Sequence, residues 1–215
     1  MIERPIMFTG EMVRAILAGR KTETRRVMKP QPEFTATGSW HWGHKDRHRI
    51  PCGPRGVHGG SAFPFDAEAI GTYCPYGVPG SRIYVKEALI GVIDTILSPN
   101  ETMPVAAYEA DRGHIWTKDK YREPWGWKQA RLPSMFMPKR FTRIWLEITG
   151  VGVRRVQDMD NNDALAEGTP DIRTTENNFD MRDCFHVLWD SIYAKRGYGW
   201  DTNPHVWVIQ FERMK

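Results

Sequence analysis

The chain has 215 residues, with 30 Lys and Arg against 26 Asp and Glu, a formal net charge of +4 and an isoelectric point near 9.0. This length suits one domain with its own core, and the weakly basic balance favours anionic partners without the charge density of a histone-like tail. Three widely spaced cysteines argue against a disulfide framework, and no apolar run approaches the ~20 residues of a membrane span, so we expect a cytoplasmic protein that binds no membrane.

A strand and a helix are predicted at the start of the chain, in "RPIMF" and "GEMVRAILAG". Thr9 is placed to cap the start of this helix, and Gly19 to end it in the left-handed conformation. Met12 and Ile16 share its apolar face. The basic octapeptide that begins at Gly19, "GRKTETRR", therefore falls on the helix exit, in the turn before the next strand. Taken alone, such a run is typical of a solvated helix end.

The middle of the chain shows little periodicity. Residues from about 30 to 80 are rich in Gly, Pro and His, which predicts an irregular insertion. Two short strands are predicted further on, in "RIYVKEAL" and "VAAYEA". A second long loop, about 112–138, is punctuated by Trp and Pro and carries many cations, so it is suited to closing over a ligand.

The last third has the strongest patterns. Alternation in "RFTRIWLEITGVGVRRV" predicts a strand, with a bulge or bend at Gly150 and Gly152. Asp160 can cap a short helix that ends at Gly168, and a longer amphipathic helix is predicted over about 179–195. The segment "HVWVIQFERMK" is apolar on both faces, as a central strand is. Short strands outnumber helices without βαβ alternation, which favours an α+β fold with a small mixed β-barrel flanked by helices.

The octapeptide also carries a family resemblance. Within "ILAGRKTETRR", four residues match the Gly-x-Lys-x-x-(Glu or Thr)-x-Arg signature of ASCH domains: Gly19, Lys21, Thr24 and Arg26. The stretch "LEITGVGVRRVQDMDNNDALAEG" and the final "WVIQFER" resemble the second half of that domain, and the layout resembles the larger ASCH proteins of bacteriophages and prophages. The resemblance implies a single PUA-like β-barrel domain over residues 1–215, interrupted by the two insertions.

The same resemblance implies a chemistry. Small bacterial N4-acetylcytidine amidohydrolases of this family use a Lys, a Thr and a Glu, which fall here on Lys21, Thr24 and Glu167. It implies that Thr24 is the nucleophile, Lys21 the base that activates it, and Glu167 the acid/base that serves the departing nitrogen. Lysine acts as a base only where burial or neighbouring cations lower its pKa. The implied partner is RNA or a modified nucleoside.

Cations and aromatic residues give a set of candidate RNA contacts, in which indoles stack on bases and cations meet phosphates. The set consists of Arg20, Arg25, Arg26, Trp125, Trp127, Lys139 and Arg140. An equal alternative is that the tryptophans only fill the side of the barrel. Two other functions stay open: a non-catalytic RNA-binding regulatory module, and a ribonuclease that uses Lys21 with a histidine of the first insertion.

That insertion contains "HWGHKDRHRIPC", in which four residues are weak candidates for a zinc site: His41, His44, His48 and Cys52. The chain has no Cys-x-x-Cys pair, and cations interleaved with the histidines also suit a polyanion-binding loop. We therefore expect no metal and no cofactor.

Overall fold

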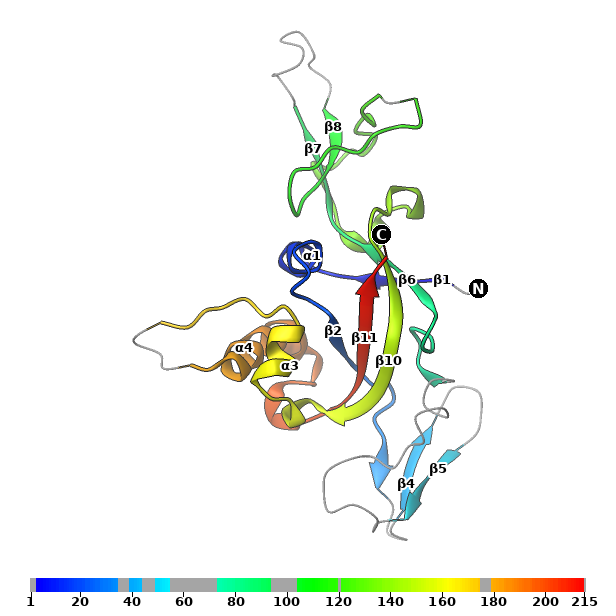
Figure 1. Cartoon of the computed structure of the whole chain (residues 1–215), viewed down its shortest axis with the longest axis vertical. Helices are drawn as coiled ribbons and strands as arrows, with labels where there is room; N and C mark the ends of the chain where they lie inside the picture. The colour runs from blue at the N-terminus through cyan, green and yellow to red at the C-terminus, as the bar shows by residue number, and fades with distance from the viewer. Residues whose placement is uncertain are drawn as a thin grey trace.

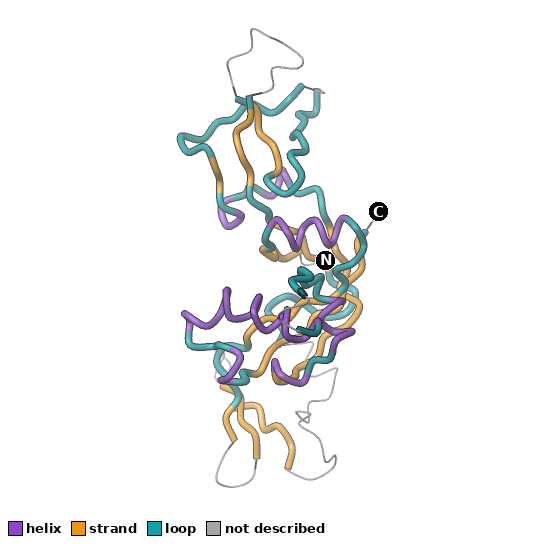
Figure 2. Tube along the Cα trace, turned by 90° about the vertical axis from the view of Figure 1, so that its left-hand side faces the viewer, coloured by secondary structure: helices purple, strands orange, loops and turns teal. Residues whose placement is uncertain are grey.

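The computed structural model describes residues 3–34, 39–43, 49–54, 73–93, 104–119, 121–174 and 179–214; for the strands between 39 and 54 it describes the backbone. The molecule is elongated, with a central sheet in the middle and a smaller sheet at each end of the long axis (Figure 1). The view from the side shows the same order, with the helices gathered around the central part (Figure 2).

The central sheet is mixed. Its five strands, in spatial order, are β1 (Glu3–Met7), β6 (Arg82–Lys86), β10 (Trp145–Arg155), β11 (His205–Arg213) and β2 (Glu23–Val27). β1 and β6 run parallel, and the other neighbours are antiparallel. This confirms the α+β class. Within the described residues no ladder joins the edge strands β1 and β2, so the closed barrel stays a prediction.

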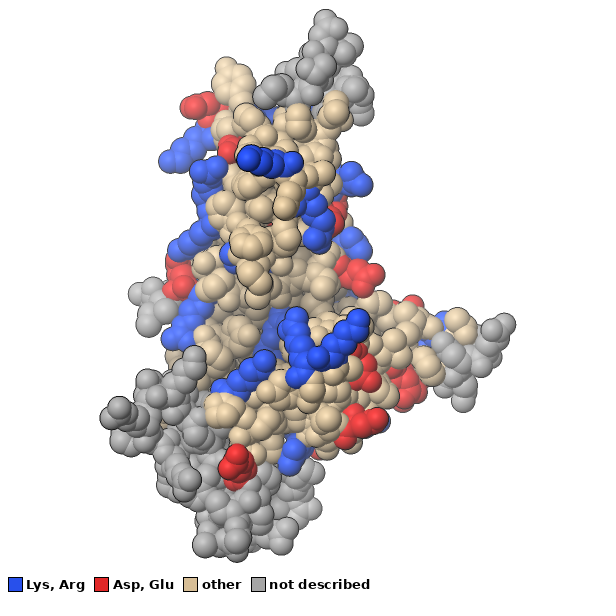
Figure 3. Space-filling view, turned by 180° about the vertical axis from the view of Figure 1, so that it is seen from behind, with Lys and Arg blue, Asp and Glu red and all other residues tan. Residues whose placement is uncertain are grey.

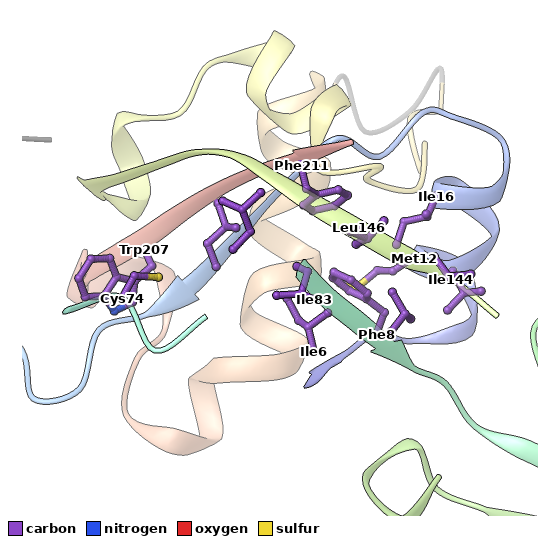
Figure 4. Packing of buried hydrophobic residues seen from close by; sticks show 14 of the residues in the cluster. Ile6, Phe8, Met12, Ile16, Cys74, Ile83, Ile144, Leu146, Trp207 and Phe211 are labelled. Carbon is purple, nitrogen blue, oxygen red and sulfur yellow. The ribbon is translucent and has the colours of Figure 1, made fainter. Parts of the chain in front are cut away.

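The main core lies between one face of this sheet and helix α1 (Gly10–Leu17), as the close view shows (Figure 4). Alternate residues of each strand enter it, because side chains along a strand point to opposite faces. The buried residues include Ile83 and Val85 of β6, Leu146 and Ile148 of β10, and Ile209 and Phe211 of β11. The ladder of β10 and β11 shifts register between Ile148 and Gly150, which confirms the predicted bulge.

Helix α1 is confirmed with both of its ends. The Thr9 side chain accepts a hydrogen bond from the amide of Met12, and Gly19 adopts a φ of 72°. The octapeptide that follows differs from the expectation. β2 begins already at Glu23, and Lys21 and Thr24 are both buried, so the predictions of a turn and of a solvated helix end are wrong. The reason is long-range: β2 pairs with β11 and contacts α3.

Two helices cover the other face of β11 and β2. They are α3 (Asn161–Ala166) and α4 (Met181–Tyr193), capped by Asp160 and Asp180. Phe185 and Trp189 of α4 belong to one apolar cluster with Val206 and Val208 of β11. β11 is thus buried on both faces, which confirms the predicted central strand. Short 3₁₀ helices complete the chain: η1 (Ser134–Phe136), η2 (Lys139–Phe141), η3 (Val156–Asp158), η4 (Ala194–Arg196) and η5 (Trp200–Thr202).

The insertions contain strands that the sequence did not predict. In the first, β3 (Glu33–Phe34), β4 (Ser39–Gly43) and β5 (Arg49–Pro54) form an antiparallel sheet, so the irregular description is wrong for this part. In the second, β9 (Arg131–Leu132) pairs with β7 (Leu89–Val92), which also pairs with β8 (Val105–Tyr108). Leu89, Tyr108 and Phe141 give this sheet a small core of its own.

Candidate functional site

A buried ion pair between Lys21 and Glu167 forms the centre of the site. The Lys21 Nζ donates to Glu167 Oε2 at 2.6 Å, to the main-chain oxygen of Glu167 at 2.6 Å and to that of Glu23 at 2.8 Å. An ammonium group has three hydrogens, so all of its donors are engaged. The structure therefore brings together two of the three residues that the resemblance singles out.

The local sequence around Gly168 explains why these two residues meet. Gly168 ends the α3 segment with a φ of +67°, and a Cβ built there would lie 2.7 Å from the Cβ of Ala15 and 2.8 Å from that of Lys21. Glycine alone permits both the conformation and this close approach. The end of α3 is thereby held against the end of α1, with the Glu167 side chain directed at Lys21.

The second carboxylate oxygen of Glu167 closes the edge of the central sheet. Oε1 accepts a hydrogen bond from the main-chain amide of Arg25, on the edge strand β2. This amide belongs to the row of unpaired groups that an edge strand presents. Glu167 thus ties the end of α3 both to the backbone of β2 and to Lys21.

Arg25 is surrounded by carboxylates. Its guanidinium contacts Glu23 Oε1 at 2.5 Å, Asp163 Oδ2 at 2.8 Å and Glu167 Oε1 at 3.6 Å, and its side chain is fully buried. This arrangement fastens α3 to β2, and it leaves the guanidinium no surface from which to meet a phosphate. The expectation that Arg25 contacts a ligand is therefore not supported by its position. The sequence analysis does not predict either contact: no local pattern marks Glu23, and the capping box that marks Asp163 places it only at the start of α3.

Burial dominates the electrostatics of Lys21. It lowers the pKa of the amine below its ordinary value, although the charge and hydrogen bond of Glu167 act to raise it. Arg26 and Arg25 add smaller repulsions in the lowering direction. Burial likewise raises the pKa of Glu23, against the opposing effect of Arg25. A lysine with a lowered pKa is what base catalysis at neutral pH needs.

Thr24 and Arg26 lie on the opposite face of β2 from Arg25. Thr24 pairs with Ile209 and Arg26 with Trp207, so both share the face that turns toward the main core. Phe8 packs in the same region. The centroid of its ring lies 5.3 Å from Lys21 Nζ and 5.1 Å from the Arg26 guanidinium. Among the described residues no hydrogen bond joins the Thr24 hydroxyl to the Lys21 amine.

Arg26 connects the two edge strands of the central sheet, β2 and β1. Its Nη2 donates to the main-chain oxygen of Met7, at the end of β1, over 2.8 Å. Arg26 is half-buried, two positions along β2 from Thr24 and on the same face. The guanidinium is thus the cation that shares a strand face with the proposed nucleophile, whereas Arg20 is exposed at the helix exit.

The aromatic candidates pack on the second small sheet. The ring centroids of Trp125 and Trp127 lie 4.8 Å apart. Those of Trp127 and Phe141 lie 6.0 Å apart, in a T-shaped arrangement. Trp125 also covers Gly91, where a Cβ would come within 2.8 Å of its ring, and its Nε1 donates to the main-chain oxygen of Gln129. These contacts favour the alternative in which the tryptophans fill the side of the protein.

The two remaining cationic candidates are exposed and ion-paired. Lys139 contacts Glu3 at 2.5 Å, and Arg140 contacts Glu123 at 3.1 Å. Figure 3 shows Lys and Arg spread over the height of one face, with Asp and Glu between them. Charge by itself therefore does not mark one site on that face.

The zinc candidates are only partly described. His41 lies on β4 opposite Pro51, and Cys52 lies on β5 opposite Trp40; His44 and His48 lie outside the described residues. In the part of the chain that the structure describes, no three His, Cys, Asp or Glu side chains are grouped to hold a metal ion. Nor does any helix there have the length and apolar character needed to cross a membrane.

No protein-family model, curated protein or solved structure matches this chain.

Proposed function

We propose that the chain is an ASCH-domain protein whose central sheet corresponds to the PUA-like barrel, and that it removes the acetyl group from N4-acetylcytidine. The observation that supports the proposal is the buried contact of Lys21 with Glu167 at 2.6 Å. These residues are 146 positions apart, and only the family resemblance pairs them. A buried pair with a lowered lysine pKa suits proton transfer.

The proposed reaction begins inside the ion pair. A proton passes from the Lys21 ammonium, whose pKa burial lowers, to the Glu167 carboxylate, which leaves a neutral amine and a neutral acid. The amine then takes the hydroxyl proton of Thr24 as Oγ1 attacks the acetyl carbonyl carbon. The Thr24 hydroxyl reaches the Lys21 amine by a rearrangement when substrate binds, because catalytic hydrogen bonds often form only in the complex.

The tetrahedral intermediate carries a negative oxygen. Arg26, on the same face of β2 as Thr24, is placed to stabilise this charge. Collapse breaks the bond between the acetyl carbon and N4, and Glu167 returns its proton to the departing nitrogen, which releases cytidine. Water then hydrolyses the acetyl ester of Thr24 to acetate, with Glu167 taking the proton of the water and the Thr24 oxygen regaining one from Lys21.

The test is incubation of the pure protein with N4-acetylcytidine, followed by chromatography of the nucleosides. We expect cytidine to accumulate with the wild type and to be absent with Thr24→Ala. Thr22→Ala is the matched control, because Thr22 is an exposed threonine two positions from Thr24. We expect this variant to have wild-type activity. Equal activity of both variants would remove the nucleophile from the proposal.

A second candidate function is a non-catalytic RNA-binding module. It is favoured by the finding that Lys21 already uses its three donors within the protein and makes no described hydrogen bond to Thr24. Strongly salt-dependent RNA binding without release of cytidine would support it. Cleavage of the RNA in the same experiment would instead support the ribonuclease alternative, whose histidine candidates have no described side chains.

A further inference from the structure

A hollow of about 620 Å³ lies at one end of the central sheet, outside the Lys21 site. Its volume falls in the range of ~300–1,000 Å³ that small-ligand sites have. Six residues line it: Glu3, Arg82, Arg143, Trp145, Arg213 and Met214. Arg82 and Trp145 alternate with the buried Ile83 and Leu146, so they project from the face of β6 and β10 that is turned away from the main core.

Two of the charged residues in this hollow are already compensated. Arg143 contacts Glu87 at 2.8 Å and Asp111 at 2.7 Å. Glu3 contacts Lys139 at 2.5 Å, outside the lining. These contacts hold the walls in place, and they leave little net charge on either side chain for a ligand.

The other two arginines are different. Within the described part of the chain, the guanidinium groups of Arg82 and Arg213 make no hydrogen bond and no ion pair at contact distance, although the charge of Arg82 helps to lower the pKa of Glu3 on the neighbouring strand. Arg82 is half-buried and Arg213 is exposed, and they come from β6 and β11, on either side of β10. Glu147 lies across from Arg82 in the ladder, but it does not line the hollow. A guanidinium group suits phosphate, because its planar donors match two oxygens at once.

Trp145 supplies an aromatic surface in the same hollow, whereas Arg213, which pairs with the buried Leu146, reaches the hollow from the other face of the sheet at its end. Trp145 is half-buried against Tyr84, with ring centroids 5.7 Å apart, and the Lys139 amine lies 5.6 Å from its ring. An indole held in this way is a platform on which an unpaired base stacks. An aromatic platform that shares a hollow with two guanidinium groups has the composition of a site for one nucleotide.

We propose that this hollow binds one nucleotide unit of single-stranded RNA, with the base against Trp145 and the flanking phosphates against Arg82 and Arg213. The proposal rests on the proposed function for the class of ligand, RNA, but not for the chemistry of Lys21, Thr24 and Glu167. It assigns substrate binding to a surface that the family signature does not include.

The experiment measures binding of a short fluorescein-labelled oligouridylate by fluorescence anisotropy at several salt concentrations. For Arg82→Ala/Arg213→Ala we expect affinity to fall at least about tenfold. The slope of log K against log salt should fall by about 1.4, because each phosphate contact with a single strand contributes about 0.7. For Trp145→Ala we expect a loss of affinity of roughly 5- to 150-fold with little change in slope.

The control variant Arg173→Ala/Lys195→Ala removes the same charge from exposed positions before and after α4, and its affinity should stay within about twofold of the wild type. Hydrolysis of the free nucleoside N4-acetylcytidine, which has no phosphate, should be unchanged in Arg82→Ala/Arg213→Ala. This readout separates failure of the hollow from failure of the proposed reaction. Wild-type affinity and slope in the double variant, or equal losses in the control, would overturn the proposal.

Discussion

Lys21 and Glu167 form a buried ion pair at 2.6 Å, although 146 positions separate them in the sequence. The contact joins the exit of α1, the backbone of β2 and the end of α3. Stability and the proposed chemistry therefore depend on the same two side chains.

Breaking this pair on one side should be costly. In Glu167→Gln the Lys21 ammonium stays buried without its anion, so we expect the free energy of unfolding to fall by about 3–5 kcal/mol. In Lys21→Met/Glu167→Gln the unpaired charge is gone, and most of that loss should be recovered. Urea denaturation of the three proteins measures both effects. A double variant as unstable as Glu167→Gln would contradict this account of the pair.

Gly168 should tolerate no side chain. Its φ of +67° and the contacts that a Cβ would make with Ala15 and Lys21 predict a loss of about 2–4 kcal/mol for Gly168→Ala. Gly197→Ala is the matched control, because Gly197 has a φ of +78° with nothing within 4 Å of a built Cβ, and about 1 kcal/mol is expected. Thermal unfolding of both variants checks the difference; equal losses would show that the close approach is unimportant.

His205 should make the protein acid-sensitive. Burial, with a smaller contribution from Arg155, lowers the pKa of His205 from 6.5 to about 4. Between these values the unfolded chain binds a proton that the folded chain does not, so the free energy of unfolding falls as the pH falls from about 6.5 to about 4. The contribution amounts to about 3 kcal/mol. Denaturation across this pH window should show a shallower dependence for His205→Gln; identical curves would assign the acid sensitivity elsewhere.

Arg143 should be important for joining the second small sheet to the rest of the protein. It contacts the buried Glu87 and also Asp111, and its guanidinium lies 3.8 Å from the ring of Tyr108. Burial raises the pKa of Glu87, and Arg143 opposes this shift. Removing the cation in Arg143→Met leaves Glu87 buried and unpaired, which should destabilise the fold by about 3–5 kcal/mol.

The comparison for Arg143→Met is Arg131→Ala, which breaks an exposed ion pair with Glu109. Exposed pairs contribute about 0–1 kcal/mol, so this variant should unfold nearly as the wild type does. Chemical denaturation ranks the two variants. A larger effect for Arg131→Ala would mean that burial does not decide the strength of these contacts.

Local patterns predicted the elements that short stretches of sequence determine. The alternation of β10, the continuous apolar run of β11, the Thr9 cap and the left-handed Gly19 all follow from neighbouring residues. The burial of Lys21 and Thr24 could not be predicted in this way, because it depends on the pairing of β2 with β11 and on α3, about 140 residues further on. In the two small sheets β8 was predicted, whereas the other strands were missed. β3 and β9 have two residues each, and Pro or Gly interrupts the alternation of β5 and β7.

The candidate site likewise contains residues that a local motif predicts and residues that it does not. Lys21 and Thr24 belong to one motif, whereas Glu167 was predicted from the family resemblance and not from its spacing to these residues. The supporting residue Glu23 carries no local signal. Asp163 belongs to the capping box of α3, but that pattern does not predict its contact with Arg25. The hollow beside Trp145 is likewise assembled from strands far apart in the chain.

The proposed reaction requires that Thr24 becomes acetylated during turnover. The most direct measurement is rapid acid quenching of the protein with N4-acetylcytidine, followed by mass spectrometry of its peptides. We predict one acetyl group on Thr24 in the wild type and none on the corresponding peptide of Thr24→Ala, which should also release no cytidine. Cytidine released by Thr24→Ala at the wild-type rate, with no acetylated residue in either protein, would contradict the proposed reaction.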